Sequence, residues 1–173
     1  MKELILGGAR SGKSAMAEQR AVASGLDVVY VATAQALDEE MAQRIARHRR
    51  DRPDHWLVVE EPFYLNEVLQ QYGQAGRCVL VDCLTLWLSN LLHHAQPSLF
   101  EAQRDALLDG LEAVSSDLIF VSNEVSMGIV PMGAMNRRFC DEAGRLHQAL
   151  AECCDRVTLM VAGLPLAVKG ETL

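Results

Sequence analysis

The chain has 173 residues, half of them hydrophobic, and its formal net charge is −7 at pH 7. This length allows a substantial hydrophobic core and predicts a single domain that spans residues 1–173. Proteins that bind nucleic acid through general electrostatics need a basic surface that displaces counterions, so the acidic balance argues against nucleic acid as a partner.

Short apolar runs alternate with longer amphipathic stretches, which is typical of an α/β fold with a mostly parallel sheet flanked by helices. Several runs are too continuously apolar to leave one face in water, as expected of central strands. We predict strands at residues 3–6, 28–33, 57–60, 78–82, 118–122 and 157–162. Helices are predicted at residues 13–24, 38–50, 65–72, 84–94, 100–114 and 137–154.

A glycine-rich loop joins the first predicted strand to the first predicted helix and matches the P-loop pattern GxxxxGK[ST]. Backbone N–H groups of such a loop and the following helix N-terminus bind phosphates. Lys13 would reach the β- and γ-phosphates of ATP or GTP, and Ser14 would ligate Mg²⁺. A glycine turn that merely precedes a helix is the alternative, which the strand and helix context disfavours. The predicted loop residues are Gly7, Gly8, Ala9, Arg10, Ser11, Gly12, Lys13 and Ser14.

A carboxylate that ends a neighbouring strand is the usual partner of the P-loop serine around Mg²⁺. Val79, Leu80 and Val81 are apolar, and the predicted strand ends at Asp82. We therefore predict that Asp82 and Ser14 hold the ion together. Asp is also a common N-cap, and the next predicted helix begins two residues later, so the pattern leaves both roles open.

The predicted helix at residues 38–50 is acidic in its first turn and arginine-rich in its last, which complements the helix dipole. His48 shares a stripe with Met41 and Ile45, on the face expected to point inward. Beside several guanidinium groups its protonated form is disfavoured, which leaves a neutral nitrogen able to attack phosphorus. A solvated histidine on a basic helix end is the alternative, and the spacing does not decide between them.

Several motifs in order are similar to a known family, the bifunctional adenosylcobinamide kinase/adenosylcobinamide-phosphate guanylyltransferases of cobalamin biosynthesis. They are GGARSGKS at residues 7–14, YVATAQALDEEMAQRIARHRRDRP at 30–53, HW at 55–56, VDCLT at 81–85 and NEVSMGIVP at 123–131. The resemblance implies a RecA-like P-loop fold and a homotrimer. It also implies two Mg²⁺-dependent reactions on a corrinoid substrate: phosphorylation of adenosylcobinamide by ATP or GTP, then GMP transfer from GTP to give adenosylcobinamide-GDP.

The resemblance assigns residues as well. The histidine of the family motif RIxxHRxxRP, which carries a covalent guanylyl group, corresponds to His48, so His48 and Lys13 are the expected catalytic residues. The other positions that resemble nucleotide-contacting residues are Thr33, Ala34, Gln35, Arg49, Arg50, Asp51, Arg52, Glu60 and Asp82.

Asn123 and Glu124 follow a predicted strand, where ligands of parallel sheets gather. They are candidates either for positioning the corrinoid or its attacking hydroxyl, or for capping the loop. The chain departs from the family pattern at Ser126, where glycine is usual, and at His147, where the similar segment GRLNQ has asparagine. We expect these departures to bear on the local loop geometry and the corrinoid contacts, and not on the nucleotide chemistry.

Two other functions fit parts of the sequence. A kinase that transfers only the γ-phosphoryl group would leave His48 structural. A nucleotide-dependent switch protein would signal by loop ordering, but the chain has no NKxD guanine-specificity motif. The five cysteines show no CxxC or Cys/His zinc spacing, and the sequence has no signal peptide or apolar run long enough to span a bilayer. We therefore expect a cytoplasmic location without a transmembrane segment.

Overall fold

The computed structural model describes residues 1–36, 38–39, 42–43, 46 and 53–171. Within these residues the strands form one seven-stranded sheet, in the order β3-β2-β4-β5-β1-β6-β7. Pairings among β1 to β6 are parallel, and β7 pairs antiparallel with β6, so the predicted α/β class with a mostly parallel sheet is confirmed. The strands are β1 (Lys2–Gly7), β2 (Asp27–Ala32), β3 (Leu57–Glu60), β4 (Arg77–Asp82), β5 (Asp117–Asn123), β6 (Arg156–Val161) and β7 (Leu164–Lys169).

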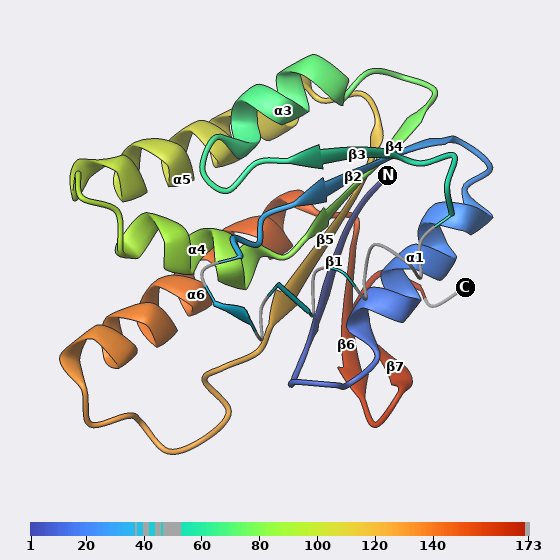
Figure 1. Cartoon of the computed structure of the whole chain (residues 1–173). Helices are drawn as coiled ribbons and strands as arrows, with labels where there is room; N and C mark the ends of the chain where they lie inside the picture. Colours follow the sequence, from blue (N-terminus) through green and yellow to red (C-terminus); the bar gives the residue numbers. More distant parts are fainter. Residues whose placement is uncertain (37, 40–41, 44–45, 47–52, 172–173) are drawn as a thin grey trace.

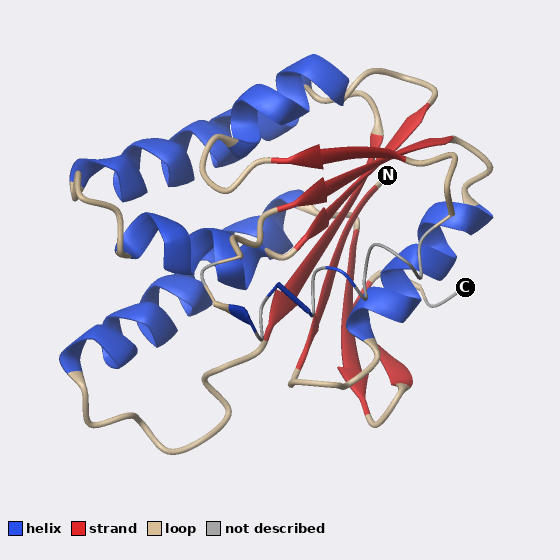
Figure 2. Cartoon of the chain, in the orientation of Figure 1, coloured by secondary structure: helices blue, strands red, loops and turns tan. Residues whose placement is uncertain are grey.

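Helices cover both faces of the sheet, with α1 on one face and α3, α4, α5 and α6 on the other (Figures 1 and 2). Their bounds are α1 (Lys13–Ala23), α3 (Leu65–Tyr72), α4 (Leu84–Leu92), α5 (Ser98–Gly110) and α6 (Ala134–Cys153), with a 3-10 turn η1 at Leu111–Ala113. The predicted helix at 38–50 lies largely outside the described residues. Within it, the N–H of Ala42 donates to the carbonyl of Asp38 over 3.0 Å.

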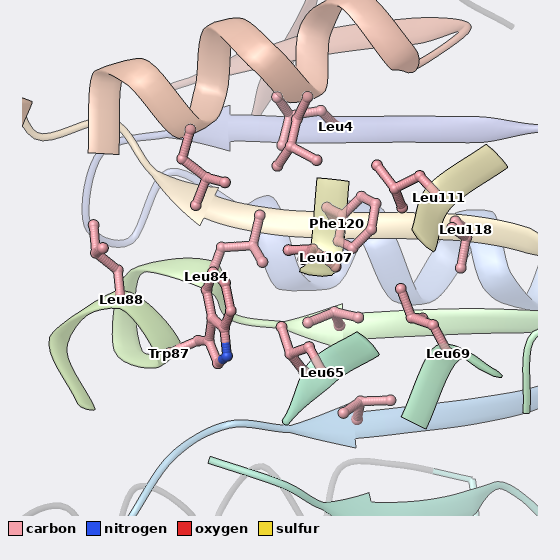
Figure 3. Packing of buried hydrophobic residues seen from close by; sticks show 14 of the residues in the cluster. Leu4, Leu65, Leu69, Leu84, Trp87, Leu88, Leu107, Leu111, Leu118 and Phe120 are labelled. Atoms are coloured by element: carbon pink, nitrogen blue, oxygen red, sulfur yellow. The ribbon is translucent and has the colours of Figure 1, made fainter. Parts of the chain in front are cut away.

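Each face of the sheet carries its own hydrophobic core, because successive residues of a strand point to opposite faces. In β1, Leu4 packs into the cluster beneath α3 to α6, and Ile5 packs beneath α1 with Ala17 and Ala21. The first cluster is the larger and includes Trp87 and Phe120 (Figure 3). All six predicted strands are present, within one residue of their predicted ends.

Two features of the sheet were not predicted. Asp82 was expected on a strand beside β1, but β5 lies between β1 and β4, so that expectation was wrong. The antiparallel strand β7 was also missed. It follows β6 through a two-residue turn in which Ala162 and Gly163 both have positive φ, at 52° and 82°, as in the tight turns of β-hairpins. A membrane-spanning helix is absent from the part of the chain that the structure describes.

Candidate active site

The loop at residues 7–14 leaves the carboxyl end of β1 and enters α1, as the P-loop pattern predicts. A Cβ atom on Gly7 would lie 2.6 Å from the carbonyl oxygen of Met160 on β6, so only glycine fits there. Gly12 has a φ of 97° and precedes the first residue of α1. The N–H of Gly163 in the β6–β7 turn donates to the carbonyl of Ser11 over 3.1 Å. The neighbouring strand and its turn therefore hold the loop in place.

Lys13, one of the two charged residues of the loop, is only 7% exposed. Its Nζ donates to the carbonyl oxygen of Gly8 over 2.6 Å, so the side chain reaches back across the loop to its backbone. Burial lowers the pKa of Lys13, while the nearby Cys83 and Asp82 act in the opposite direction. The fold thus brings the P-loop lysine close to the carboxyl end of β4.

Asp82 is half-buried at the end of β4, and its Oδ2 accepts a hydrogen bond of 3.0 Å from the hydroxyl of Tyr30. Ser14 is half-buried in the first turn of α1. Among the described residues no cluster of three or more His, Cys, Asp or Glu side chains could hold a metal by itself. A carboxylate and a hydroxyl nevertheless fit Mg²⁺, which takes its remaining ligands from substrate phosphates and water.

A buried hydrogen-bond pair fixes the segment that follows β4. The Oγ1 of Thr33 donates to the carbonyl of Cys83 over 2.7 Å and accepts from the N–H of Cys83 over 2.9 Å. Asn90 of α4 donates to the carbonyl of Thr33 over 2.8 Å. The peptide bond between Asp82 and Cys83 is cis. Thr33 was predicted as a nucleotide contact; its fully buried side chain joins the ends of β2 and β4, and a contact with nucleotide stays a prediction.

A second polar cluster lies at the end of β5. The Nε2 of His147 on α6 is 2.7 Å from the hydroxyl of Ser122, which is 3.4 Å from the hydroxyl of Thr85 on α4. Nδ1 of His147 is 4.0 Å from Oε2 of Glu124. The other carboxylate oxygen of Glu124, Oε1, accepts from both the N–H and the hydroxyl of Ser126. Glu124 therefore caps its loop, which is one of the two roles that the sequence left open.

The electrostatics of this cluster favour an ionised Glu124 beside a neutral histidine. Burial lowers the pKa of His147, although Glu124 acts to raise it. Burial also acts to raise the pKa of Glu124, but the hydrogen bonds from Ser126, the nearby His147 and the N–H of Met127 outweigh it and leave that pKa lowered.

The remaining predicted residues fall into two groups. Ala34 and Gln35 follow β2 and are half-buried, and Glu60 ends β3 and is exposed, paired in register with Ala32. The second group lies outside the described residues: His48, Arg49, Arg50, Asp51 and Arg52.

The sequence reading missed the link from Ser122 to His147 and the contact of the β6–β7 turn with the P-loop. The first had a signal: His147 lies on the same helical stripe as Ala143 and Leu150, which is the apolar face of a predicted helix. A polar side chain on such a face needs a partner. The second had no local signal, because it depends on which strand lies beside β1.

Comparison with known proteins identifies the family. The model of the CobU family, described as cobinamide kinase / cobinamide phosphate guanyltransferase, matches residues 3–168. The chain belongs to this family. It is 57% identical over its whole length to the bifunctional adenosylcobalamin biosynthesis protein CobP of Pseudomonas aeruginosa, with all of both chains covered. It is 37% identical to the bifunctional protein CobU of Escherichia coli K12, with 98% of this chain and 100% of that protein covered.

Solved structures support the fold. The chain is similar to the RadB recombinase, with a TM-score of 0.53 at 16% identity, covering 91% of this chain and 73% of that one. It is also similar to a protein of Pyrococcus horikoshii OT3, with a TM-score of 0.55 at 10% identity, covering 99% and 87%. The family resemblance and the RecA-like P-loop fold inferred from the sequence are therefore confirmed, and as a CobU-family member the chain is a bifunctional kinase and guanylyltransferase.

Proposed function

We propose that this CobU-family chain phosphorylates adenosylcobinamide with ATP or GTP and then transfers GMP from GTP to the new phosphate, giving adenosylcobinamide-GDP. Both reactions would use one domain and one nucleotide site. The observation that carries this proposal is the P-loop with Lys13 buried across it and close to Asp82, because one cradle of this kind binds the phosphates of either nucleotide. The family match supplies the acceptor class, a corrinoid.

In the kinase step the acceptor hydroxyl attacks the γ-phosphorus and a nucleoside diphosphate leaves. Lys13 would hold the β- and γ-phosphates, and the loop N–H groups would bind the phosphate oxygens. Ser14 and Asp82 would hold Mg²⁺, which supplies neutralisation of the charge that develops on the phosphates.

In the guanylyl step we propose that His48 attacks the α-phosphorus of GTP. A nitrogen–phosphorus bond forms, the bond to the β-phosphate oxygen breaks, and pyrophosphate leaves. The acceptor phosphate then displaces the histidine. The arginines that follow His48 in the sequence, Arg49, Arg50 and Arg52, would stabilise the charge of the leaving pyrophosphate. Thr33, Ala34, Gln35, Asp51 and Glu60 belong to the same proposal as nucleotide contacts. Support for these assignments is the sequence resemblance.

The assay is incubation with Mg²⁺ and GTP labelled at the α-phosphate, followed by mapping of the adduct under non-acidic conditions. We expect GMP on His48, its absence in His48→Ala with much of the kinase activity retained, and normal labelling in His93→Ala, which removes an exposed histidine at the end of α4. Lys13→Ala should impair both reactions. Equal loss of both reactions in a folded His48→Ala variant would contradict the division of roles. If the wild-type protein binds nucleotide but is not labelled, the guanylyl step is contradicted and only the kinase activity remains proposed.

We further propose a homotrimer in the cytoplasm. The exposed Leu164, Leu166 and Val168 of the edge strand β7 offer apolar surface that such an assembly would cover. Five free thiols suit a reducing compartment. Sedimentation equilibrium tests the assembly, which should have three times the chain mass of 19.0 kDa; a monomer at micromolar concentration would contradict it.

A further inference from the structure

The hydrogen bonds around Ser122 have one consistent direction. The hydroxyl oxygen of Thr85 accepts from the N–H of Asn123 over 2.8 Å, so its own hydrogen can point to Ser122. The hydrogen of Ser122 is then available to His147, whose Nε2 accepts it in the tautomer that carries its hydrogen on Nδ1. A neutral imidazole carries one hydrogen, which in this arrangement lies on Nδ1 and faces Glu124. Each donor is used once, and the series of hydrogen bonds leads to the carboxylate of Glu124.

The arrangement has the order of a serine–histidine–carboxylate triad, but Ser122 is not placed to act as a nucleophile. Ser122 is 1% exposed, and its hydroxyl contacts Thr85 and His147, which are buried as well. Glu124 is the most exposed member, with a side chain that is 14% exposed. A ligand can therefore reach the network at Glu124, and the buried residues act through it.

Glu124 lies next to the first residue of the P-loop. Its N–H donates to the carbonyl of Gly7 over 3.0 Å, and Asn123 is the register partner of Gly7 in the adjacent strand. β5 stands between β1, which carries the P-loop, and β4, which carries Asp82. Because ligands of parallel sheets bind at the carboxyl ends of the strands, Glu124 lies at the edge of the sheet where the nucleotide phosphates are expected.

We propose that Glu124 accepts the proton of the acceptor hydroxyl in the kinase step and that His147 positions its carboxylate. The proposal rests on the proposed function. The hydroxyl oxygen bonds to the γ-phosphorus, the bond to the β-phosphate oxygen breaks, the nucleoside diphosphate leaves, and the proton passes to Glu124 and then to solvent. Kinases of another class use an aspartate in the same way. The 4.0 Å between Nδ1 and Oε2 is longer than a hydrogen bond, and such contacts often tighten in the substrate complex.

The guanylyl step has no such need. Its final nucleophile is an oxygen of a phosphate that is already ionised at neutral pH, so no proton has to be removed. Loss of Glu124 should therefore separate the two activities. A carboxylate that only caps its loop would affect both reactions through the shared nucleotide site.

The test is Glu124→Gln, compared with Glu112→Gln, which changes an exposed carboxylate on η1. Kinase kcat should fall by about 10²- to 10⁴-fold in Glu124→Gln, with nucleotide Kd and guanylyl transfer to a supplied acceptor phosphate changed far less. Kinase kcat within about threefold of wild type, or equal losses in both reactions, would overturn the proposal. If Glu124→Gln does not fold, Glu124→Asp moves the carboxylate back by one methylene and should show the same selective loss. A wild-type protein without kinase activity would instead overturn the proposed function.

The role of His147 has its own matched pair. Asparagine places an amide nitrogen near the position of Nδ1, and glutamine places one near Nε2. If His147 positions Glu124 through Nδ1, His147→Asn should retain more kinase kcat than His147→Gln, with similar acceptor KM values. A purely structural role through Ser122 predicts the opposite order, and either that order or equal kcat values would overturn the positioning role.

Discussion

Thr33→Val removes one oxygen atom from the fully buried link between β2 and the segment after β4. The hydroxyl of Thr33 makes two hydrogen bonds to Cys83, at 2.7 and 2.9 Å. Valine has nearly the same shape, so packing changes little, but the N–H and the carbonyl of Cys83 both lose this partner. The carbonyl of Cys83 keeps the N–H of Trp87 as a donor, at 3.2 Å, whereas the N–H of Cys83 loses its acceptor. A buried N–H left unpaired costs about 1–3 kcal/mol and the other lost hydrogen bond about 1 kcal/mol, so we expect a loss of about 2–4 kcal/mol in the free energy of unfolding.

The assay is thermal and urea unfolding of Thr33→Val beside Thr33→Ser, which keeps the hydroxyl. At about 2–4 °C per kcal/mol for a chain of this size, the valine variant should unfold about 5–15 °C lower. Its affinity for ATP should also fall, because Asp82 precedes the released residue. A loss below about 0.5 kcal/mol, or equal losses in both variants, would refute the reasoning that these two hydrogen bonds hold the segment.

Two further predictions concern the P-loop and the thiols. Gly7→Ala should lower the unfolding temperature and nucleotide affinity together, because its Cβ would lie 2.6 Å from a backbone oxygen of β6; wild-type affinity by calorimetry would contradict this. Exposed Cys153 should react with a thiol reagent at pH 8 in the folded protein. Cys83 and Cys154 should react only on unfolding, since burial raises the pKa of Cys83 to about 11 and of Cys154 to about 12. At pH 8 at most about one in a thousand of these thiols is ionised. Fast labelling of either cysteine in mass spectra would contradict their burial.

Local sequence predicted most of the elements. The apolar run before Asp82 is a strand, and α3 begins and ends where its periodicity indicates. β7 was missed because Pro165 weakens a strand signal and its turn, Ala162-Gly163, lacks the residues most typical of a hairpin. The sequence motif also led directly to Lys13.

By itself the sequence determined what depends on neighbours along the chain: the P-loop, the alternation of strands and helices, and the family. The tertiary structure decided which strand ends meet. It placed β5 between β1 and β4 and brought Glu124 against Gly7. It also joined Ser122 to His147, which lies 25 residues further along the chain on α6. The physical reason is that strand order and the pairing of buried polar groups depend on packing over the whole sheet. A local segment supplies only one of the two partners in each of these contacts.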